Sequence, residues 1–321
     1  MRSKIDIKKI GKNAINNELL AVQGLLDSVN DEFVKAVNLI FKSEGRVIVT
    51  GIGKSAIIAH KIVATFNSTG TPSIFLHAAD AIHGDIGIVR KEDVVIALSK
   101  SGETPEVKVL VPLLKARKNK MVAMVGNTSS YLAKHSDIIL DVSVEKEACP
   151  NNLAPTSSTT AQMVMGDALA ISLLEIRGFT ASDFAKFHPG GALGKRMFLR
   201  VEDLSLNNEV PKVDKDESME NVIIEISTKR LGTTAVLDGG KLVGVITDGD
   251  LRRMIQKFPD YLSLKAEDAM SANPETIGYD ELVVEALSRM REGNITQMPV
   301  MNGEKYVGVI HLHDILREGI F

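Results

Sequence analysis

Five short apolar segments, interleaved with helical stretches, constrain the fold of this chain more than any other feature. They are rich in β-branched side chains and occupy residues 47–50, 73–76, 94–98, 122–125 and 138–142. Segments of this length and composition are typical of buried parallel strands. Strands that alternate with helices predict an α/β fold, in which a five-stranded parallel, doubly wound sheet carries helices on both faces.

The residues that directly follow the third strand predict a ligand site, because ligands bind beyond the carboxyl ends of the strands in open sheets of this kind. Ser99, Ser101 and Thr104 lie there, and Thr104-Pro105 is typical of a helix N-cap and first turn. Hydroxyl groups and free backbone N–H groups at a helix N-terminus favour an anion, with phosphate as the leading candidate. An ordinary capped turn would carry the same residues.

A second loop, Gly51-Ile52-Gly53-Lys54-Ser55, follows the first strand and can reach the same crevice. It is not a P-loop, because the glycine that a P-loop needs five residues before Gly53 is Ile48. A dinucleotide fingerprint is disfavoured, since no acidic residue ends the next strand. Lys54 stands at a helix start, where the helix dipole disfavours a cation, so a bound anion would account for it.

The loop 99–104 resembles the phosphosugar-binding loop of SIS (sugar isomerase) domains, and the whole chain resembles the arabinose-5-phosphate isomerases. The resemblance also rests on residues 51–55, 83–85, 147–150, 154–160 and 188–194. It implies interconversion of D-arabinose 5-phosphate and D-ribulose 5-phosphate through an enediol, which supplies 3-deoxy-D-manno-octulosonate for lipopolysaccharide biosynthesis. Two alternatives stay open: an isomerase of another sugar phosphate, and a non-catalytic regulator that senses a phosphosugar.

An aldose–ketose isomerase must remove a proton beside a carbonyl and return it one carbon away, and a carboxylate can do both. Glu147 follows the last strand and matches the acid/base glutamate of the family. The resemblance adds Lys54, Glu106, His83 and His188 as further catalytic residues, and it leaves open which histidine opens the ring. It also implies contacts to phosphate or substrate from Ser55, Gly70, Thr71, Ser99, Ser101 and Thr104.

The second part of the chain repeats itself. Residues 244–250 and 308–314 share a Gly-Val-Ile pattern ending in aspartate, 64 residues apart. They resemble tandem CBS motifs, which form an α+β module that commonly binds adenosine nucleotides. The resemblance implies a nucleotide or a pathway metabolite as ligand, with Thr247, Asp250 and Asp314 at contacting positions. A pair that only stabilises an oligomer is the alternative.

These patterns predict three parts of the chain: an SIS isomerase domain over 1–200, a linker over 201–208, and a CBS module over 209–321. The two CBS motifs are expected at about 209–259 and 268–321. Residues 4–43 are expected to be helical, with an apolar stripe that packs on the domain or on another subunit. The resemblance implies a homotetramer.

Composition limits the partners. The net charge is −3, from 38 basic and 41 acidic residues, which does not suggest a nucleic-acid partner. A single cysteine, the lack of a secretory signal and the lack of a long apolar segment favour a cytoplasmic protein with no membrane contact. The isomerisation needs no cofactor, although the resemblance implies that His77 can bind an inhibitory or structural zinc.

Overall fold

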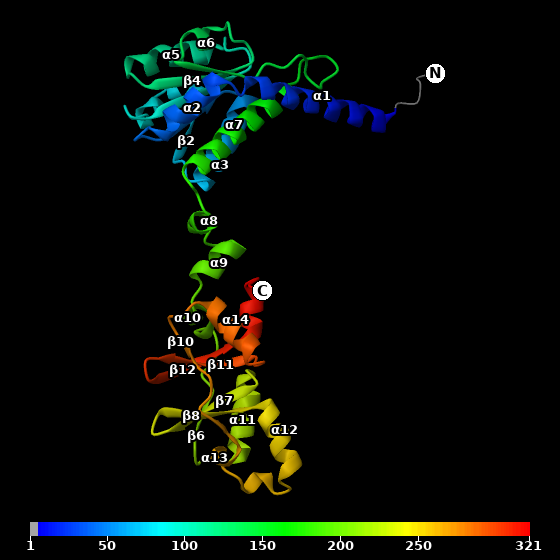
Figure 1. The fold of residues 1–321 in the computed structure, drawn as a ribbon, viewed down its shortest axis with the longest axis vertical. Helices are drawn as coiled ribbons and strands as arrows, with labels where there is room; N and C mark the ends of the chain where they lie inside the picture. The colour runs from blue at the N-terminus through cyan, green and yellow to red at the C-terminus, as the bar shows by residue number, and fades with distance from the viewer. Residues whose placement is uncertain (1–5) are drawn as a thin grey trace. The chain divides into compact units, whose positions relative to one another are not determined.

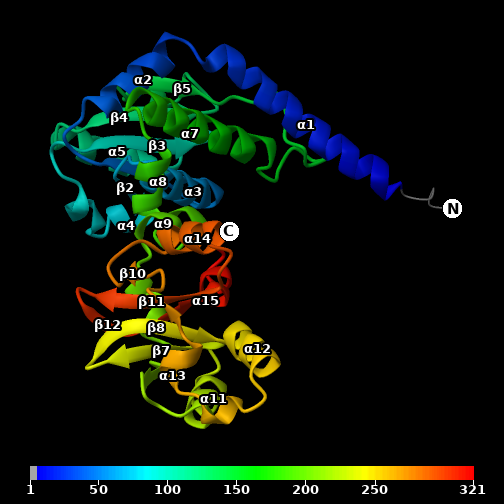
Figure 2. The same cartoon turned by 60° about the horizontal axis from the view of Figure 1, so that its bottom comes forward.

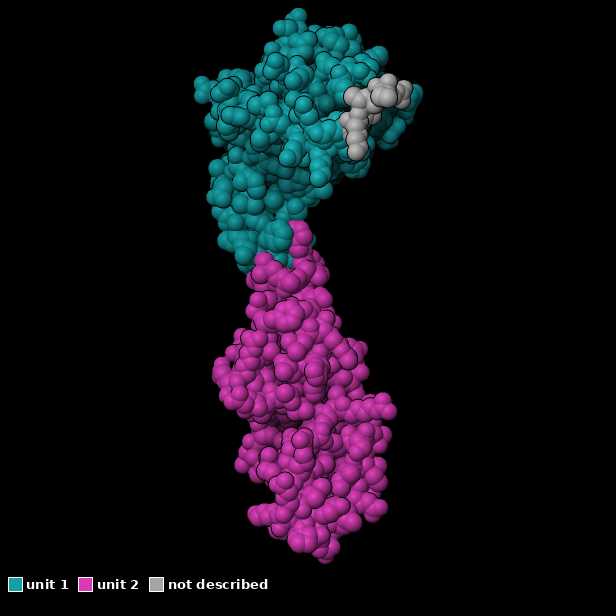
Figure 3. All heavy atoms as spheres, turned by 90° about the vertical axis from the view of Figure 1, so that its right-hand side faces the viewer, with its two compact units in different colours: residues 1–187 teal, residues 188–321 magenta. Residues whose placement is uncertain are grey.

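The computed structural model describes residues 6–321, and the chain divides into two compact units (Figure 3). The first unit ends at Phe187 and the second runs from His188 to Phe321. The sequence placed the end of the first domain near residue 200, whereas the first unit ends earlier. Each unit has hydrophobic clusters of its own, so each is described by itself.

The first unit contains a single sheet of five parallel strands in the order β2-β1-β3-β4-β5 (Figure 1). The expected five-stranded parallel sheet is confirmed, with small shifts at the strand ends. The strands are β1 (Val47–Gly51), β2 (Ser73–His77), β3 (Val94–Ser99), β4 (Lys120–Val125) and β5 (Ile138–Asp141).

Helices cover both faces of this sheet, as Figures 1 and 2 show. Val49 and Ile96 pack towards one set of helices, whereas the neighbouring Ile48 and Val95 pack towards the other. Burial on both faces explains why the strands are apolar throughout. The helical elements are α1 (Ile7–Ser28), α2 (Asp31–Phe41), α3 (Lys54–Ser68), α4 (Ala78–Ala81), η1 (Asp85–Ile88), α5 (Pro105–Ala116), α6 (Tyr131–Lys134), α7 (Ser157–Ile176) and α8 (Ala181–Phe187).

The strand order turns back on itself between β1 and β3. The chain runs from β1 outwards to β2, then crosses to β3 on the opposite side of β1. The loops that leave β1 and β3 therefore diverge, and a crevice opens between them at the carboxyl edge of the sheet. Both loops with phosphate-binding character, after Gly51 and after Ser99, lie at this switch point.

The amino-terminal helices are present where they were expected, as α1 and α2. Asn30 is the N-cap of α2, and its Oδ1 accepts a hydrogen bond from the backbone N–H of Glu32 at 2.9 Å. Leu25 of α1 is buried, but Ile15 and Leu19 are more than half exposed. In Figures 1 and 2 the amino-terminal part of α1 extends beyond the sheet. Most of the expected apolar stripe is therefore not covered within one chain.

The second unit contains two small sheets, with strand orders β6-β7-β8-β9 and β10-β11-β12. Each has a β-hairpin followed by a helix, as expected for a repeated α+β module. Its elements are α9 (Ala192–Phe198), α10 (Val201–Ser205), β6 (Lys212–Asp214), α11 (Met219–Lys229), β7 (Thr233–Asp238), β8 (Lys241–Thr247), α12 (Asp248–Lys257), η2 (Tyr261–Ser263), α13 (Ala266–Ala269), β9 (Ser271–Ala272), β10 (Ile277–Gly278), α14 (Val283–Glu292), β11 (Gln297–Asn302), β12 (Lys305–His311) and α15 (Leu312–Arg317).

The predicted linker at 201–208 is wrong. The segment contains α10, whose Val201 and Leu204 are buried in the hydrophobic cluster of the second repeat. Its backbone is also tied down, because Val201 N–H donates to the carbonyl of Glu281 at 2.9 Å. Two apolar residues three positions apart were too short a pattern to predict a helix. Among the described residues, no helix is both long and apolar enough to span a membrane.

Candidate active site and nucleotide cleft

A pocket of about 320 Å³ lies at the carboxyl edge of the first sheet, at the switch point between β1 and β3. This volume is within the range of small-molecule sites. The loops after β1 and β3 and the start of α7 contribute its walls. The lining residues are Ile52, Lys54, Ser55, Leu98, Ser99, Lys100, Ser101, Thr104, Pro155, Ser158 and Thr159.

The loop after β3 is held in shape by its own side chains. Ser99 Oγ accepts a hydrogen bond from the Gly102 N–H at 3.0 Å, and Ser101 Oγ accepts one from the Glu103 N–H at 3.2 Å. Gly102 has φ +64°, and a Cβ there would lie 2.1 Å from Ser130 Oγ. Only glycine fits this turn. The hydroxyl protons of both serines remain available to a ligand, because these two bonds use the oxygens as acceptors.

Thr104 lines the pocket with a hydroxyl group that has no hydrogen-bond partner. It occupies the N-cap position of α5, as expected, but its side chain makes no capping hydrogen bond. Its Oγ1 is buried and lacks a hydrogen-bond partner. Leaving such a group unpaired costs about 1–3 kcal/mol. An oxygen atom of a bound anion would supply the missing acceptor.

The loop after β1 brings a cation and a second hydroxyl to the pocket. Gly53, with φ +56°, precedes α3 and makes no side-chain cap, so the first turn of α3 is open to a ligand. Lys54 begins α3, and no carboxylate of the described residues forms an ion pair with it. Ser55 Oγ donates to Gln162 Oε1 at 3.1 Å. The loop therefore offers positive charge where an anion would bind.

Glu147 lies beside the pocket with its carboxylate completely enclosed. Five donors converge on its two oxygens. Lys100 Nζ and Ser158 Oγ donate to Oε1 at 2.6 and 2.5 Å. The Thr156 N–H, the Thr156 hydroxyl and the Ser158 N–H donate to Oε2 at 2.8, 3.2 and 3.1 Å. Two of these donors are backbone amides at the N-terminus of α7, where a helix favours negative charge.

These contacts keep Glu147 ionised although it is buried. Burial alone would raise the pKa of the carboxyl. The hydrogen bonds from Lys100, Ser158 and the backbone of Thr156 outweigh burial and lower the pKa from 4.5 to about 2. A buried carboxylate that stays charged beside an anion-binding loop is a candidate base for proton transfer.

Comparison with known proteins identifies the family of this chain. The SIS domain family matches residues 39–172, and the CBS domain family matches residues 201–257 and 266–320. The arabinose 5-phosphate isomerase KdsD of Pseudomonas aeruginosa is 46% identical over 100% of this chain and 99% of its own length. The chain belongs to the arabinose 5-phosphate isomerase family. The resemblance inferred from the loop residues is thereby confirmed.

Two further family relatives support the same assignment. The arabinose 5-phosphate isomerase KdsD of Escherichia coli K12 is 44% identical over 98% of this chain and 97% of its own length. A solved structure of an E. coli CFT073 protein in complex with arabinose 5-phosphate is 41% identical, with a TM-score of 0.56, and covers 58% of this chain and 100% of that chain.

The pocket of this isomerase-family chain contains five of the residues predicted from the sequence: Lys54, Ser55, Ser99, Ser101 and Thr104. Glu147 adjoins them through Lys100 and Ser158. Two further predicted residues do not line the pocket. Glu106 is half-buried in the first turn of α5, and His83 is exposed in the turn between α4 and η1. His188 is the first residue of the second unit.

Gly70 and Thr71 lie apart from the other predicted site residues within one chain. They precede β2, at the amino edge of the sheet, whereas the pocket is at the carboxyl edge. A strand of this length separates the two edges by roughly 16 Å. Gly70 has φ +83° and packs against the ring of Phe179, and Thr71 is buried with its hydroxyl unpaired. Their contribution to this pocket is therefore not supported by the fold of a single chain.

His77 ends β2 at the carboxyl edge, and its Nδ1 lies 3.5 Å from Asp80 Oδ2. Among residues 6–321, no group of three or more His, Cys, Asp or Glu side chains is arranged to hold a metal ion. A closed zinc site needs four ligands, and an open catalytic one needs three from the protein. His77 and Asp80 supply only two ligands, so they meet neither requirement within one chain.

Lys100 is a pocket residue that the sequence analysis missed. It lies between Ser99 and Ser101, lines the pocket and forms an ion pair with Glu147. A signal was present, since a lysine inside a loop of small hydroxyl residues is unusual for a turn. Its link to Glu147 could not be predicted, because 47 residues separate the two in sequence.

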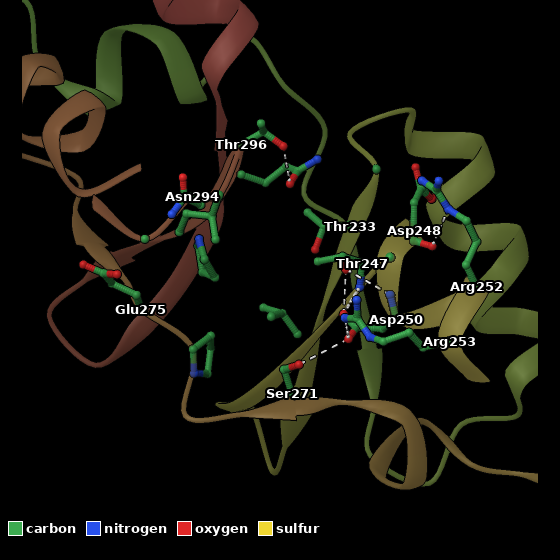
Figure 4. A pocket seen from close by; sticks show the side chains of 18 residues that line it. Thr233, Thr247, Asp248, Asp250, Arg252, Arg253, Ser271, Glu275, Asn294 and Thr296 are labelled. Atoms are coloured by element: carbon green, nitrogen blue, oxygen red, sulfur yellow. Dashed lines mark hydrogen bonds and ion pairs between the residues drawn. The ribbon is translucent and has the colours of Figure 1, made fainter. Parts of the chain in front are cut away.

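A larger cleft of about 510 Å³ lies in the second unit, between the two CBS repeats (Figure 4). Thr247 and Asp250 line it, as expected from the repeat. They also form the capping box of α12, because Thr247 Oγ1 accepts from the Asp250 N–H at 3.3 Å and Asp250 Oδ2 accepts from the Thr247 N–H at 2.9 Å. Arg253 donates to the other Asp250 oxygen at 2.6 Å, and Ser271 approaches the same oxygen at 3.3 Å. Both oxygens of this carboxylate therefore have protein partners.

The equivalent carboxylate of the second repeat does not line this cleft. Asp314 accepts hydrogen bonds from the His311 N–H at 3.2 Å and from Asn208 Nδ2 at 2.8 Å. Asn208 also donates to the carbonyl of Val309 at 3.2 Å. Of the three predicted positions, Thr247 and Asp250 thus share a cleft and Asp314 lies outside its lining.

Proposed function

We propose that this protein interconverts D-arabinose 5-phosphate and D-ribulose 5-phosphate through an enediol. One observation carries the proposal: a buried carboxylate, kept ionised by five donors, adjoins a pocket built to hold an anion. The names of the full-length relatives, 46% and 44% identical, support the same reaction. An enzyme of this kind is an intramolecular oxidoreductase, because one carbon is oxidised and its neighbour is reduced.

The phosphate of the sugar binds the loop after β3 and the start of α3. Thr104 Oγ1 gains its missing partner there, and Lys54 offsets part of the phosphate charge. Ser99 and Ser101 point hydroxyl protons at the remaining oxygens. This arrangement fixes one end of the substrate, so that its reacting carbons are presented to Glu147 at a constant distance.

The proton transfer then needs a single base. Glu147 takes the proton from C2 of the open-chain aldose, and the C2–H electron pair forms the C1–C2 double bond of the enediol while O1 gains a proton. Water gives O1 its proton and takes the proton that O2 loses, so a carbonyl is restored at C2 with no net proton change at the oxygens. Glu147 returns its proton to C1. Atoms and electrons balance without a cofactor. General acid–base catalysis of this kind contributes about 10²–10⁴-fold in rate.

The proposal is tested by measuring isomerase activity with EDTA present. Purified protein is supplied with D-arabinose 5-phosphate, and ribulose 5-phosphate is followed for the wild type and for Glu147→Gln. We expect turnover in the wild type and a loss of about 10²-fold or more in kcat for the variant. Turnover that survives in Glu147→Gln would move the base elsewhere. Binding of the sugar phosphate without turnover would favour the phosphosugar-sensing alternative, and turnover only of another sugar phosphate would favour the other isomerase.

We extend the proposal to the second unit, where a nucleotide or a pathway metabolite would occupy the cleft at Thr247 and Asp250. The cleft volume suits a ligand of this size, and Arg252 and Arg253 line it with charge that a phosphate could use. A homotetramer, a cytoplasmic location and a role in supplying 3-deoxy-D-manno-octulosonate remain predictions from the sequence. Zinc binding at His77 also remains a prediction from the sequence.

A further inference from the structure

The carboxylate of Glu147 has no free position for a substrate proton. An ionised carboxylate offers about four lone-pair directions. Five donors already occupy them: two N–H groups, two hydroxyl groups and the ammonium of Lys100. A base must turn a lone pair towards the carbon that loses the proton. Two of the donors, Lys100 Nζ and Ser158 Oγ, occupy both lone pairs of Oε1, whereas the other three share Oε2. One of these two donors must therefore leave Oε1 before Glu147 can act as proposed.

The five donors are not equally able to leave. Thr156 and Ser158 supply four of them, and these residues form the N-cap and first turn of α7, a helix of 20 residues packed on the sheet. Ser158 is almost fully buried. Lys100 supplies the fifth from a long side chain that is 46% exposed. Its ammonium can change partners by rotating about side-chain bonds. The two backbone N–H donors can move only if the helix end unfolds, and the two hydroxyl donors are carried by short side chains at the start of α7 that do not reach the far wall of the pocket.

The position of Lys100 also indicates where its ammonium goes. Lys100 lies between Ser99 and Ser101 in the loop that would bind the phosphate, and it lines the same pocket. A sugar phosphate brings close to two negative charges to this loop. A lysine ammonium that already faces the pocket will be drawn from a saturated carboxylate towards a new anion with unpaired oxygens.

We propose that Lys100 exchanges partners during the reaction. Before substrate binds, its ammonium neutralises Glu147, and on substrate binding it moves to the sugar phosphate and leaves Glu147 free to accept the proton. The inference rests on the isomerase activity proposed above. It makes the base available only when substrate is present, and it adds Lys100 to the groups that bind the phosphosugar.

The proposal predicts two effects for Lys100→Met. The KM for D-arabinose 5-phosphate should rise about tenfold or more, because a charge-assisted hydrogen bond to the substrate is lost. Removing the ammonium also removes a cause that lowers the pKa of Glu147, so the acid limb of kcat/KM should move to higher pH. Two other titratable groups near Glu147 are Lys54, which lines the pocket, and Cys149, which lies two residues after Glu147 in the sequence. Both are left unsubstituted in every variant.

Lys108→Met is the matched control. Lys108 is also 46% exposed and pairs with a glutamate, Glu103, at 2.7 Å, but it does not line the pocket. The KM of Lys108→Met should stay within about twofold of the wild-type value, and the acid limb of its kcat/KM should lie at the same pH. The phosphate of the substrate titrates near pH 6 in every variant, so only a shift specific to Lys100→Met counts. Lys100→Arg should recover part of the affinity, and Lys100→Gln replaces Met if the methionine variant does not fold.

A binding measurement separates failure of this inference from failure of the isomerase proposal. Calorimetric titration with D-arabinose 5-phosphate should show at least about tenfold weaker binding for Lys100→Met, whether or not the wild type turns the sugar over. Suppose that the wild type turns over D-arabinose 5-phosphate, and that Lys100→Met has the same affinity for it and the same acid limb of kcat/KM. The inference is then wrong, and the isomerase proposal stands. A loss of kcat with unchanged KM and pH limb would make Lys100 a positioning residue for Glu147 and overturn the exchange. If the wild type does not bind the sugar phosphate, both proposals fail.

Discussion

Glu147 is held ionised by donors that belong to the start of α7, and its charge is therefore linked to folding. Its pKa is lowered from 4.5 to about 2 in the folded protein. A carboxyl whose folded pKa lies below its unfolded value stabilises the fold above pH 4.5, and that contribution is lost as the pH falls towards 2. The contribution is at most about 3 kcal/mol, because one pKa unit corresponds to about 1.4 kcal/mol.

We therefore predict that the free energy of unfolding falls more steeply between pH 5 and pH 3 in the wild type than in Glu147→Gln. At neutral pH the variant should be less stable by about 1–3 kcal/mol, since its amide N–H₂ group would face donors rather than acceptors. Urea denaturation at a series of pH values measures both effects. Parallel curves for the two proteins would show that the carboxylate is not held as described.

The predicted residues that line the pocket are mainly those whose position follows from a strand end. Ser99, Ser101 and Ser55 each follow a predicted parallel strand directly, so the carboxyl edge of the sheet brings them together without further information. Lys100 was missed, and Thr104 was expected to use its hydroxyl as a cap. The ion pair of Lys100 joins it to a residue 47 positions away, and the Thr104 hydroxyl has no hydrogen-bond partner. Local sequence patterns reveal neither fact.

At the scale of elements, the loop after β3 depends on one backbone conformation. Gly102 has φ +64°, and a Cβ would collide with Ser130, the N-cap of α6. We predict that Gly102→Ala displaces the loop and raises the KM for D-arabinose 5-phosphate at least about tenfold, while the strands persist. Steady-state kinetics and circular dichroism measure the two parts of this prediction.

Gly178→Ala is the control for backbone strain alone. Gly178 has a similar φ of +62° at the end of α7, and a Cβ there would meet no atom within 4 Å. Both alanine variants should lose about 1 kcal/mol of stability from the left-handed backbone. Only Gly102→Ala should change KM. An unchanged KM in both would mean that the loop can bind its ligand without the observed turn.

The elements themselves follow closely from the sequence, because the apolar segments are both short and regularly spaced. Helix α7 is followed by Gly178 in the left-handed conformation, a residue choice typical of a helix end. The segment 201–208 was misjudged for a physical reason. Val201 and Leu204 are buried by strands and helices more than 70 residues later, so nothing in their own neighbourhood marks them as core.

For the whole molecule, the two units have separate hydrophobic clusters and separate pockets, so the two proposed ligands would occupy different units. The internal repeat provides a matched pair of arginines for testing the second site. Arg253 lies three residues after Asp250 and lines the cleft, whereas Arg317 lies three residues after Asp314 and does not. Removing either arginine changes the net charge of the unit by the same amount, but only Arg253 lines the cleft.

We predict that adenosine nucleotides slow hydrogen exchange in β8 and α12, whereas D-arabinose 5-phosphate slows it in the loop after β3 and at the start of α7. A ligand at ten times its Kd stabilises the state that binds it by about 1.4 kcal/mol, which is roughly tenfold slower exchange through global opening of that unit. Arg253→Met should reduce the nucleotide effect, because a phosphate contact is lost, and Arg317→Met should preserve it. Equal loss in both variants would place the nucleotide outside the cleft, and protection of neither unit by any nucleotide would leave the CBS pair with a structural role.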